Sequence, residues 1–435
     1  MSESAAPDAL LWRGDTPIDR QQFLREAASI ATQLPAGQQL VNLCEHREAF
    51  LLAFAAALIA RRTQLMPSAR TDGALAELAA EYGQPACIRD EDIQRWRTTP
   101  CNADPVELKA PDDNDKRPVL VGFTSGSTGK SQPHGKPWRS LAASARLNSG
   151  AIRAALGVPA TTSVAIIGTV PSQHMYGLEL TVLLPLLANM SVHGERPFFP
   201  ADVAAALSQP ARPRVLVSTP LHLRALAESD LTFPAFDLIT SATAPLDAGL
   251  ARHIEDRLGA PLLEMFGATE TCVVATRRTA REEEWRLYEG LELESGPDFT
   301  RVNAAWYPRP QRLQDVLEPR GAGGFVLLGR NSDLVEVAGK RASLADITRK
   351  LCAIAGVQDA VAFQPESAGS GAVNRVAAAV VSRGVSARQI AEQLAESLDA
   401  VFVPRPLLLV TRIPRDAVGK VSREQLLELV RRDAG

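Results

Sequence analysis

The sequence predicts an α/β protein in two parts, a large layered N-terminal domain and a smaller α+β C-terminal domain. Its 435 residues exceed what one hydrophobic core usually holds. Between residues 117 and 267, short β-branched runs alternate with helical stretches, which is typical of a largely parallel sheet flanked by helices. Near residue 300 the composition shifts to Pro, Gly and Arg, and a separate strand and helix pattern begins at 334.

The large part begins with a strand at 38–43 and a helix at 47–62. That helix is apolar on all sides and too short to cross a bilayer, so we expect it to be buried. Further strands are expected at 117–125, 163–170, 214–219, 236–242 and 261–267. Helices are expected between them, at 138–156, 177–189, 200–208, 220–229 and 246–258.

The small part has its own strand and helix order. Strands are expected at 334–339, 359–365, 375–381 and 406–414, and helices at 343–354, 386–399 and 422–432. We therefore predict an N-terminal domain at 1–329 and a C-terminal domain at 334–435, with the domain boundary at 329–333.

Composition narrows the class of protein. The net charge of −3 does not favour nucleic acid or a polybasic membrane contact. The five cysteines are scattered and odd in number, which favours a reducing compartment over a disulfide framework or a zinc site. The N-terminus has no basic stretch followed by an apolar one, so no signal peptide is expected. These features predict a cytoplasmic protein without a transmembrane segment.

The segment FTSGSTGKSQPHGK at 123–136 contains the letters GKS of a Walker A loop. The Walker reading fails because Thr124 stands where the first glycine belongs, and because Pro133 and Pro137 block the helix that should follow. A P-loop kinase is thereby disfavoured. The remaining Gly and hydroxyl residues could form a backbone nest for a polyphosphate, or a plain surface loop.

Other segments favour the polyphosphate. TSGSTG (124–129), PSQHMYG (171–177), SATAPL (241–246), FGATE (266–270), GRNSDLVEVAGKR (329–341) and PRDAVGKVSREQL (414–426) occur in one order. Together they resemble the motifs of the adenylate-forming superfamily, which comprises acyl- and aryl-CoA ligases, peptide-synthetase adenylation domains and luciferases. The resemblance implies that superfamily's fold, with a hinge at 330–333 and a mobile C-terminal lid domain at 334–435.

It also implies that the chain activates a carboxylic acid with ATP and Mg²⁺, releasing pyrophosphate, and passes the acyl group to a thiol. Lys420 would bridge the carboxylate and the α-phosphate, Thr269 would contact the α-phosphate, and Glu270 would bind Mg²⁺. The other ATP contacts implied are Thr124, Ser125, Gly126, Ser127, Thr128, Gly129, Ser241, Ala242, Phe266, Gly267, Asp315 and Arg330. The acid pocket implied consists of His174, Met175, Tyr176, Thr243 and Met265, and the hinge residue is Ser332. A helix-capping or core role remains an alternative for His174.

The sequence departs from the superfamily pattern at two places. Gln132 stands at the usual phosphate-loop lysine, with Lys130 and Lys136 as possible substitutes, and Ser332 stands at the hinge. A non-catalytic, adenylate-binding regulatory relative is therefore the alternative from another class.

No carrier domain follows the last motif, so the phosphopantetheine thiol is expected in trans, from an acyl carrier protein or CoA. The phrases STGKSQPH and VAGKRASL look most like the small ligases of bacterial aryl-polyene and xanthomonadin-type pigment pathways. We expect a hydroxybenzoate-type acid loaded onto a carrier protein, with an aryl- or fatty acyl-CoA ligase as the alternative.

Overall fold

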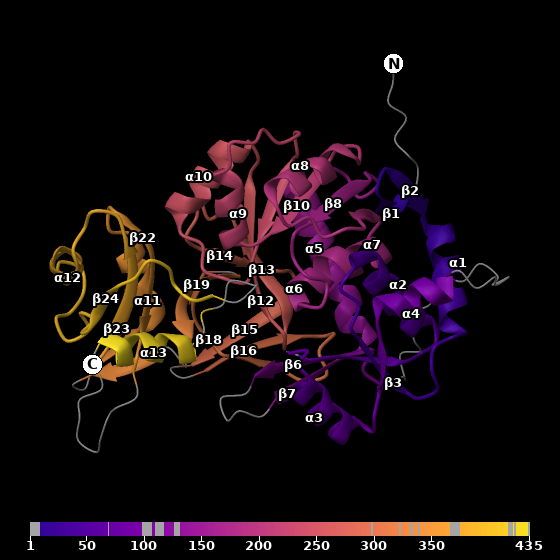
Figure 1. Cartoon of the computed structure of the whole chain (residues 1–435), viewed down its shortest axis with the longest axis horizontal. Helices are drawn as coiled ribbons and strands as arrows, with labels where there is room; N and C mark the ends of the chain where they lie inside the picture. Colours follow the sequence, from indigo (N-terminus) through magenta and orange to yellow (C-terminus); the bar gives the residue numbers. More distant parts are fainter. Residues whose placement is uncertain are drawn as a thin grey trace. The chain divides into compact units, whose positions relative to one another are not determined.

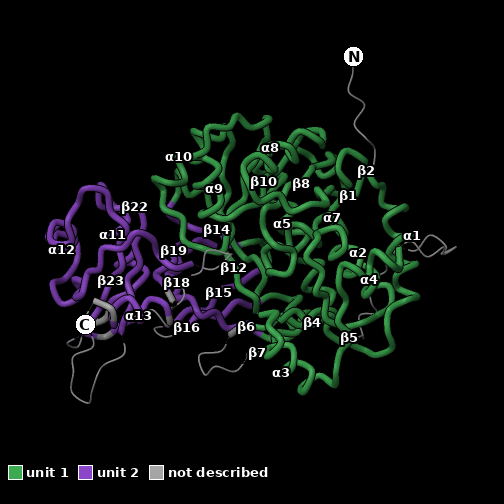
Figure 2. The backbone as a smooth tube through the Cα atoms, viewed as in Figure 1, with its two compact units in different colours: residues 1–282, 288–290, 304–309 green, residues 283–287, 291–303, 310–435 purple. Residues whose placement is uncertain are grey.

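The computed structural model describes residues 9–67, 69–97, 107–108, 117–125, 131–296, 299–321, 323–330, 334–337, 340–365, 375–415, 421 and 423–433. The chain divides into two compact units (Figure 2). Unit 1 comprises residues 1–282, 288–290 and 304–309, and unit 2 comprises residues 283–287, 291–303 and 310–435.

Unit 1 opens with two strands of a larger sheet, β1 (Ala9–Arg13) and β2 (Thr16–Asp19), and continues with the elements of a five-stranded sheet (Figure 1). In chain order these elements are α1 (Arg20–Ala31), β3 (Gln39–Asn42), α2 (Arg47–Ile59), β4 (Thr63–Met66), α3 (Asp72–Tyr82), β5 (Ala86–Ile88), α4 (Asp90–Arg97), β6 (Leu120–Ser125) and β7 (Ser131–Lys136). The sheet has the order β5-β3-β4-β6-β7, parallel except for the edge strand β7. As expected, α2 is almost wholly buried.

The rest of unit 1 builds the larger sheet. It consists of α5 (Trp138–Leu156), β8 (Val164–Gly168), α6 (Met175–Leu178), the π-helix η1 (Glu179–Leu183), α7 (Leu184–Leu187), β9 (Met190–His193), α8 (Pro200–Ser208), β10 (Arg214–Ser218), α9 (Pro220–Ala227), β11 (Leu238–Ser241), α10 (Ala248–Leu258), β12 (Leu262–Ala268) and β13 (Cys272–Arg277). Within unit 1 the strand order is β13-β12-β11-β10-β8-β9-β1-β2. The strands from β12 to β1 are parallel, and β13 and β2 are antiparallel to their neighbours.

A buried apolar cluster joins one face of this sheet to its helices. Ile167, Leu216 and Ile239 of the strands pack with Leu223 of α9 and Ile254 of α10. The alternation of strands and covering helices that the sequence predicts is confirmed. The single helix predicted at 177–189 is wrong in detail, because the segment contains α6, a wider π-helical turn and α7, ending at Leu187.

Unit 2 contains β14 (Trp285–Leu287), β15 (Leu291–Gly296), β16 (Phe299–Ala304), β17 (Gln311–Leu313), β18 (Asp315–Arg320), β19 (Gly324–Arg330), β20 (Leu334–Val337), β21 (Lys340–Ser343), α11 (Leu344–Cys352), β22 (Val357–Phe363), β23 (Ala377–Ser382), α12 (Ala387–Ala395), β24 (Leu407–Leu409) and α13 (Arg423–Asp433). Its last part is the α+β pattern expected from the sequence. Ile347 of α11, Val380 of β23 and Ile390 of α12 share one apolar cluster.

The division into units falls earlier than the predicted boundary at 329–333. β19 pairs with β14 and β18, and Gly329 lies against α11, since a Cβ there would meet the Oγ of Ser343 at 2.2 Å. The strands before residue 330 therefore group with those that follow it. Of the predicted hinge, only the backbone of Arg330 is described, so the hinge at Ser332 stays a prediction.

Candidate functional site

The carboxyl ends of the parallel strands of the larger sheet bring the motifs SATAPL and FGATE to one edge. Ser218 at the end of β10 is in register with Ser241 at the end of β11, and Ser241 is in register with Glu264 of β12. Open α/β sheets bind ligands at this edge, just beyond the strand ends. The predicted nucleotide and acid residues Ala242, Met265 and Phe266 follow these positions directly and are buried.

Hydroxyl groups line the strand ends at this edge. Thr169, after β8, and Ser218 form a hydrogen bond of 2.8 Å between their hydroxyls. The Ser241 hydroxyl is fully buried and has no partner among the residues that the structure describes. A buried polar group without a partner is costly, so Ser241 is suited to a ligand or water that would satisfy it. Thr243, two residues on, is exposed and has a positive φ of 79°.

The segment PSQHMYG forms a tight turn into α6. A Cβ on Gly177 would lie 1.9 Å from the carbonyl oxygen of Pro171, so only glycine fits there. His174 is the N-cap residue of α6, but its side chain makes no capping bond. Met175 and Tyr176 are buried, and the Tyr176 hydroxyl lies 2.8 Å from Oγ1 of Thr240. Burial raises the pKa of Tyr176, so this phenol stays neutral.

The β6–β7 hairpin and the loop 269–271, which follows β12, come together. A Cβ on Gly122 would lie 2.8 Å from Cγ2 of Thr269, so the absence of a side chain at 122 makes room for Thr269. The Nζ of Lys136 donates to the backbone oxygen of Glu270 at 2.5 Å. Lys136 is only 3% exposed. Two motifs separated by about 140 residues of chain therefore meet at direct contact.

The loop that carries Thr269 and Glu270 has two further anchors. The Tyr307 hydroxyl donates to the Thr271 carbonyl at 2.6 Å, and the Val273 amide donates to the Glu179 carboxylate at 2.9 Å. Between these anchors Cys272 has a positive φ of 64°, a conformation that non-glycine residues seldom adopt. The anchors hold the loop in a shape that it would not readily take alone.

Glu179, in the π-helix, is the centre of a buried polar network. Its carboxylate accepts from the Ser144 hydroxyl at 2.5 Å and from the Asn148 amide at 3.1 Å, and Asn148 in turn accepts from the Tyr288 hydroxyl. Burial raises the pKa of Glu179, and these bonds together with the charge of Lys136 oppose the rise. Sequence reasoning missed Glu179. Its only signal was an acid in an otherwise apolar run at 178–187.

The structure also shows what the strand β7 contributes. Gln132, His134 and Lys136 alternate along it, and lie opposite Thr124, Gly122 and Leu120 in register. Residues opposite one another share a face of a sheet, so this side is named here the inner face of the hairpin. On it, Nε2 of His134 lies 2.9 Å from Oγ1 of Thr124. Burial, Lys136 and Arg309 lower the pKa of His134.

Sequence reasoning missed His134, because the two prolines of SQPHGKP excluded a helix there and nothing marked the segment as a strand. Pro133 is compatible with β7 because an edge strand does not need every amide for pairing. Alternation within 132–136 was the available signal once a strand is assumed. Of the two possible substitutes for the missing lysine, Lys136 lies in this site, and Lys130 is outside the described residues.

Several predicted site residues lie outside the described residues, namely Gly126, Ser127, Thr128, Gly129, Ser332 and Lys420. Ser125 and Arg330 are described in their strands, as backbone only. In unit 2 Asp315 is buried at the start of β18, directly opposite Arg330 of β19 in register. The two predicted ribose contacts are therefore neighbours across one antiparallel pair.

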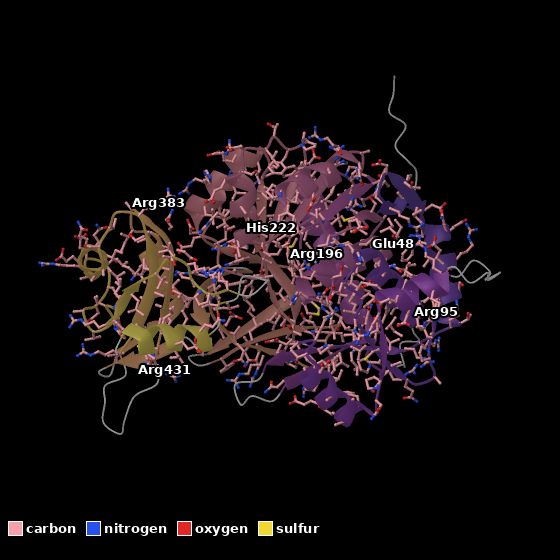
Figure 3. All side chains as sticks on the ribbon, viewed as in Figure 1. Glu48, Arg95, Arg196, His222, Arg383 and Arg431 are labelled. Carbon is pink, nitrogen blue, oxygen red and sulfur yellow. The ribbon has the colours of Figure 1, made fainter. Side chains whose placement is uncertain are left out.

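Aromatic side chains lie at the same carboxyl edge. Phe198, after β9, stacks edge to face on Phe199, and both are more than half exposed. The ring of His222 on α9 lies 5.4 Å from that of Phe198. Burial and the charge of Arg196 lower the pKa of His222, and Figure 3 labels both of these side chains. This aromatic edge was not predicted from the sequence.

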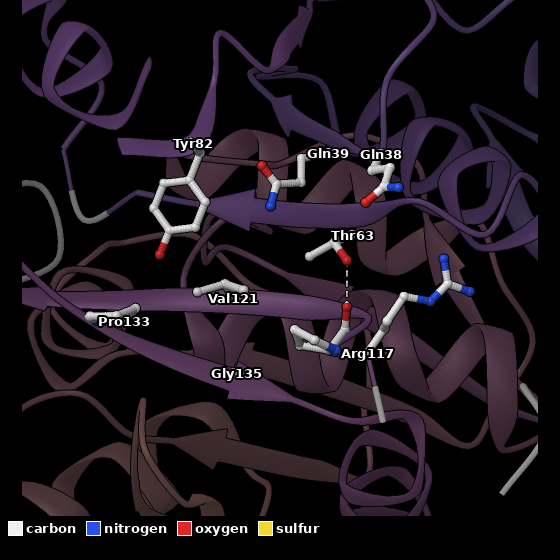
Figure 4. Close-up of a pocket in the computed structure, with 9 residues that line it drawn as sticks. Gln38, Gln39, Thr63, Tyr82, Arg117, Val121, Pro133 and Gly135 are labelled. Atoms are coloured by element: carbon white, nitrogen blue, oxygen red, sulfur yellow. Dashed lines mark hydrogen bonds between the residues drawn. The ribbon is translucent and has the colours of Figure 1, made fainter. Parts of the chain in front are cut away.

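A pocket of about 380 Å³ lies elsewhere in unit 1 (Figure 4). Gln39 and Thr63, which line it, are the first residues of β3 and β4, and Arg117 precedes β6. These positions are at the amino-end edge of the five-stranded sheet, whereas Thr124 is at its carboxyl end. The pocket is therefore distinct from the candidate site.

Glu270 is the candidate Mg²⁺ ligand. It is 9% exposed, and the described residues contain no cluster of three or more His, Cys, Asp or Glu that could hold a metal by themselves. Mg²⁺ is commonly held by one or two carboxylates plus substrate phosphates and water. A single buried carboxylate next to the hairpin that leads into the predicted phosphate loop fits that mode and does not fit a metal held by protein alone.

The comparisons with known proteins agree with this geometry. A family model described as AMP-binding enzyme matches residues 40–291. The chain is 29% identical over 313 residues to a 4-coumarate–CoA ligase of Halorhodospira halophila, covering 70% of this chain and 75% of the relative. It is 20% identical over 336 residues to a 3,4-dihydroxybenzoate–[aryl-carrier protein] ligase of Bacillus anthracis, covering 75% of this chain and 78% of the relative.

Solved structures show the same fold. ATP-bound MatB of Rhodopseudomonas palustris has a TM-score of 0.77 at 20% identity, over 95% of this chain and 93% of that one. O-succinylbenzoate CoA synthetase of Bacillus subtilis, with its acyl-adenylate, has a TM-score of 0.79 at 17% identity, over 97% and 96%. The fold is that of the adenylate-forming enzymes. Because the family model spans more than half of the 435 residues, this chain belongs to the AMP-binding enzyme family.

Proposed function

We propose that this protein is an acid–thiol ligase that makes an acyl adenylate. A carboxylate oxygen attacks the α-phosphorus of ATP, an O–P bond forms, and the bond to the β-phosphate breaks to release pyrophosphate. A thiolate then attacks the acyl carbon, a C–S bond forms, and AMP leaves. The family to which the chain belongs supports this reaction class.

One observation carries the proposal. Thr269 and Glu270 lie against the β6–β7 hairpin, through Gly122 and through the Lys136 ammonium. Two anions must meet in the first step, so donors and positive charge fixed near the reacting phosphate lower its barrier. This contact brings a hydroxyl, a carboxylate and a buried ammonium beside the strand that leads into the predicted phosphate loop.

The remaining roles follow the sequence motifs. Phe266 and Ser241 to Thr243 would contact the adenine and the acid, and Asp315 with Arg330 would contact the ribose. Glu270 would hold Mg²⁺, which when bound supplies positive charge to the phosphate oxygens. Lys420 would bridge the carboxylate and the α-phosphate, and a rotation of the C-terminal part about Ser332 would then remove it.

We further propose a hydroxybenzoate-type acid and a carrier-protein thiol, in a pigment pathway of the aryl-polyene or xanthomonadin type. Support comes from the relatives, whose names include 4-coumarate–CoA ligase, 4-chlorobenzoate–CoA ligase and 3,4-dihydroxybenzoate–[aryl-carrier protein] ligase. All of these act on aromatic acids. Two of the three names end in CoA ligase, so transfer to CoA is the second candidate.

Acid-dependent ATP–pyrophosphate exchange tests the reaction class. A panel of hydroxybenzoates, cinnamates, fatty acids and amino acids should give exchange with one aromatic group of acids. The acceptor is then identified by offering CoA and a phosphopantetheinylated carrier protein in separate reactions. Lys420→Ala should abolish exchange while ATP still binds. ATP binding without exchange for any acid in the wild type would favour the non-catalytic adenylate-binding relative.

A further inference from the structure

The inner face of the hairpin carries a histidine that the reaction as proposed does not use. His134 lies opposite Gly122 on the partner strand, and Gly122 is the residue against which Thr269 of the candidate site packs. Its Nε2 lies 2.9 Å from Oγ1 of Thr124, the first residue of the predicted phosphate loop. The ring is half-buried rather than enclosed in a core.

We propose that His134 is a positioning residue that directs the hydroxyl proton of Thr124 toward the triphosphate of ATP. The inference rests on the proposed function, because it needs a phosphate beside Thr124. It also gives the chain a second way, besides Lys136, to compensate for Gln132 at the usual lysine position.

The argument is one of proton counting. A threonine hydroxyl has a single proton, and phosphate oxygens only accept hydrogen bonds. If Nε2 of His134 accepts the hydrogen bond, the Thr124 hydroxyl donates its only proton to the histidine and presents lone pairs to the phosphate. If Nε2 carries the proton and donates, the Thr124 proton is free for a phosphate oxygen. The 2.9 Å contact therefore favours phosphate binding in one tautomer and opposes it in the other.

The charges around His134 make this arrangement sensitive to pH. Burial lowers the pKa of His134, and the charges of Lys136 on the same strand and of Arg309 from the segment 304–309 lower it further, which favours the neutral ring in the free protein. A bound triphosphate opposes both cations and raises that pKa again. The imidazolium donates from both nitrogens, so the bound state takes up a proton and ATP affinity should rise as pH falls.

Variants of both partners test the contact by calorimetric measurement of ATP binding. His134→Leu and Thr124→Val should each raise the Kd by about five- to tenfold, as expected for one hydrogen bond. The double variant should be no weaker than either single one. His134→Gln, whose amide can donate from a similar position, should stay within about twofold of the wild type. His253→Gln, on the exposed side of α10, is the matched control, and thermal melting checks that each variant is folded.

The pH dependence separates positioning from packing. Between about pH 8 and pH 6, the wild type should gain ATP affinity relative to His134→Gln, and the ionisation of ATP itself cancels in that ratio. Three outcomes would each overturn the inference while ATP–pyrophosphate exchange persists in the wild type. The effects on Kd could add in the double variant, or the ratio of ATP affinities between the wild type and His134→Gln could stay constant with pH. The third outcome is that His134→Gln binds ATP as weakly as His134→Leu. A wild type that binds no ATP would overturn the proposed function as well.

Discussion

Replacing Lys136 by methionine removes the ammonium beneath Glu270 and keeps a chain of similar length and volume. The wild-type bond is charge-assisted, 2.5 Å long and buried, and its acceptor is the carbonyl of the residue predicted to hold Mg²⁺. A hydrogen bond to a charged group contributes about 1.5–3 kcal/mol, and a buried acceptor left without a donor keeps its desolvation penalty. Part of this loss is offset because the ammonium no longer has to be desolvated.

We therefore expect the free energy of unfolding to fall by about 2 kcal/mol in Lys136→Met. The loop would keep its anchors at Tyr307 and Glu179, but the carbonyl of Glu270 would lose its hydrogen bond from Lys136. A displacement of about 1 Å at a reacting centre costs on the order of a hundredfold in rate. Acid-dependent ATP–pyrophosphate exchange should therefore fall by about that factor while the protein remains folded.

Lys350→Met is a matched control. Lys350 also donates from Nζ to a backbone carbonyl, that of Ser397, at 2.8 Å, and it pairs with the Asp346 carboxylate at 3.2 Å, but its side chain is 30% exposed and lies in unit 2. An exposed contact of this kind contributes about 0–1 kcal/mol, and no loss of exchange is expected. Urea unfolding followed by circular dichroism, together with exchange, compares the two variants. Equal stability and equal exchange in both would refute the argument that Lys136 fixes the loop.

Three further predictions concern the same region. Gly122→Ala should lower the rate of ATP–pyrophosphate exchange by at least tenfold, with little change in the free energy of unfolding. The reason is that the new Cβ would lie 2.8 Å from Cγ2 of Thr269 and displace that residue. An unchanged exchange rate would contradict the contact. Tyr307→Phe should lower the free energy of unfolding by about 1 kcal/mol, since it removes only the hydrogen bond to the Thr271 carbonyl. Urea titration measures this loss. A loss no larger than the experimental error would show that this anchor is weak. Burial raises the pKa of the Cys272 thiol to about 12, whereas Cys87 is exposed. Iodoacetamide applied to the native protein at mildly alkaline pH should therefore label Cys87 and leave Cys272 unlabelled, as read by mass spectrometry. Equal labelling of the two cysteines would place the 269–272 loop at the surface.

Much of the fold follows from local pattern. The strands β8, β10, β11 and β12 lie where short, mostly apolar runs occur, since a buried parallel strand needs an almost continuous apolar run. Elements outside the motifs were less visible. The segments 63–66 and 86–88 are short strands paired with β3, and their few residues carry too little alternation to stand out.

The residues of the candidate site form two groups, those that the sequence identifies and those that only the folded chain identifies. Residues inside motifs, such as Glu270 and Ser241, could be named from sequence because their neighbours mark them. Glu179, Tyr307 and His134 could not be named, because each acts through a contact with a distant segment and carries no local signature. Their partners are Val273, Thr271 and Thr124. Such pairings are created by tertiary structure and were visible only in the folded chain.

The triple anchoring of the 269–273 loop has a consequence for engineering. The anchors come from residues 136, 179 and 307. The conformation of the motif therefore depends on contacts with three segments that span 172 positions of the chain. Transplanting FGATE alone into a related scaffold would transfer the motif sequence without the residues that anchor its loop. A hybrid enzyme that changes the acid it accepts should therefore keep β7, the π-helix and the 304–309 segment from one parent, and place its crossovers outside them.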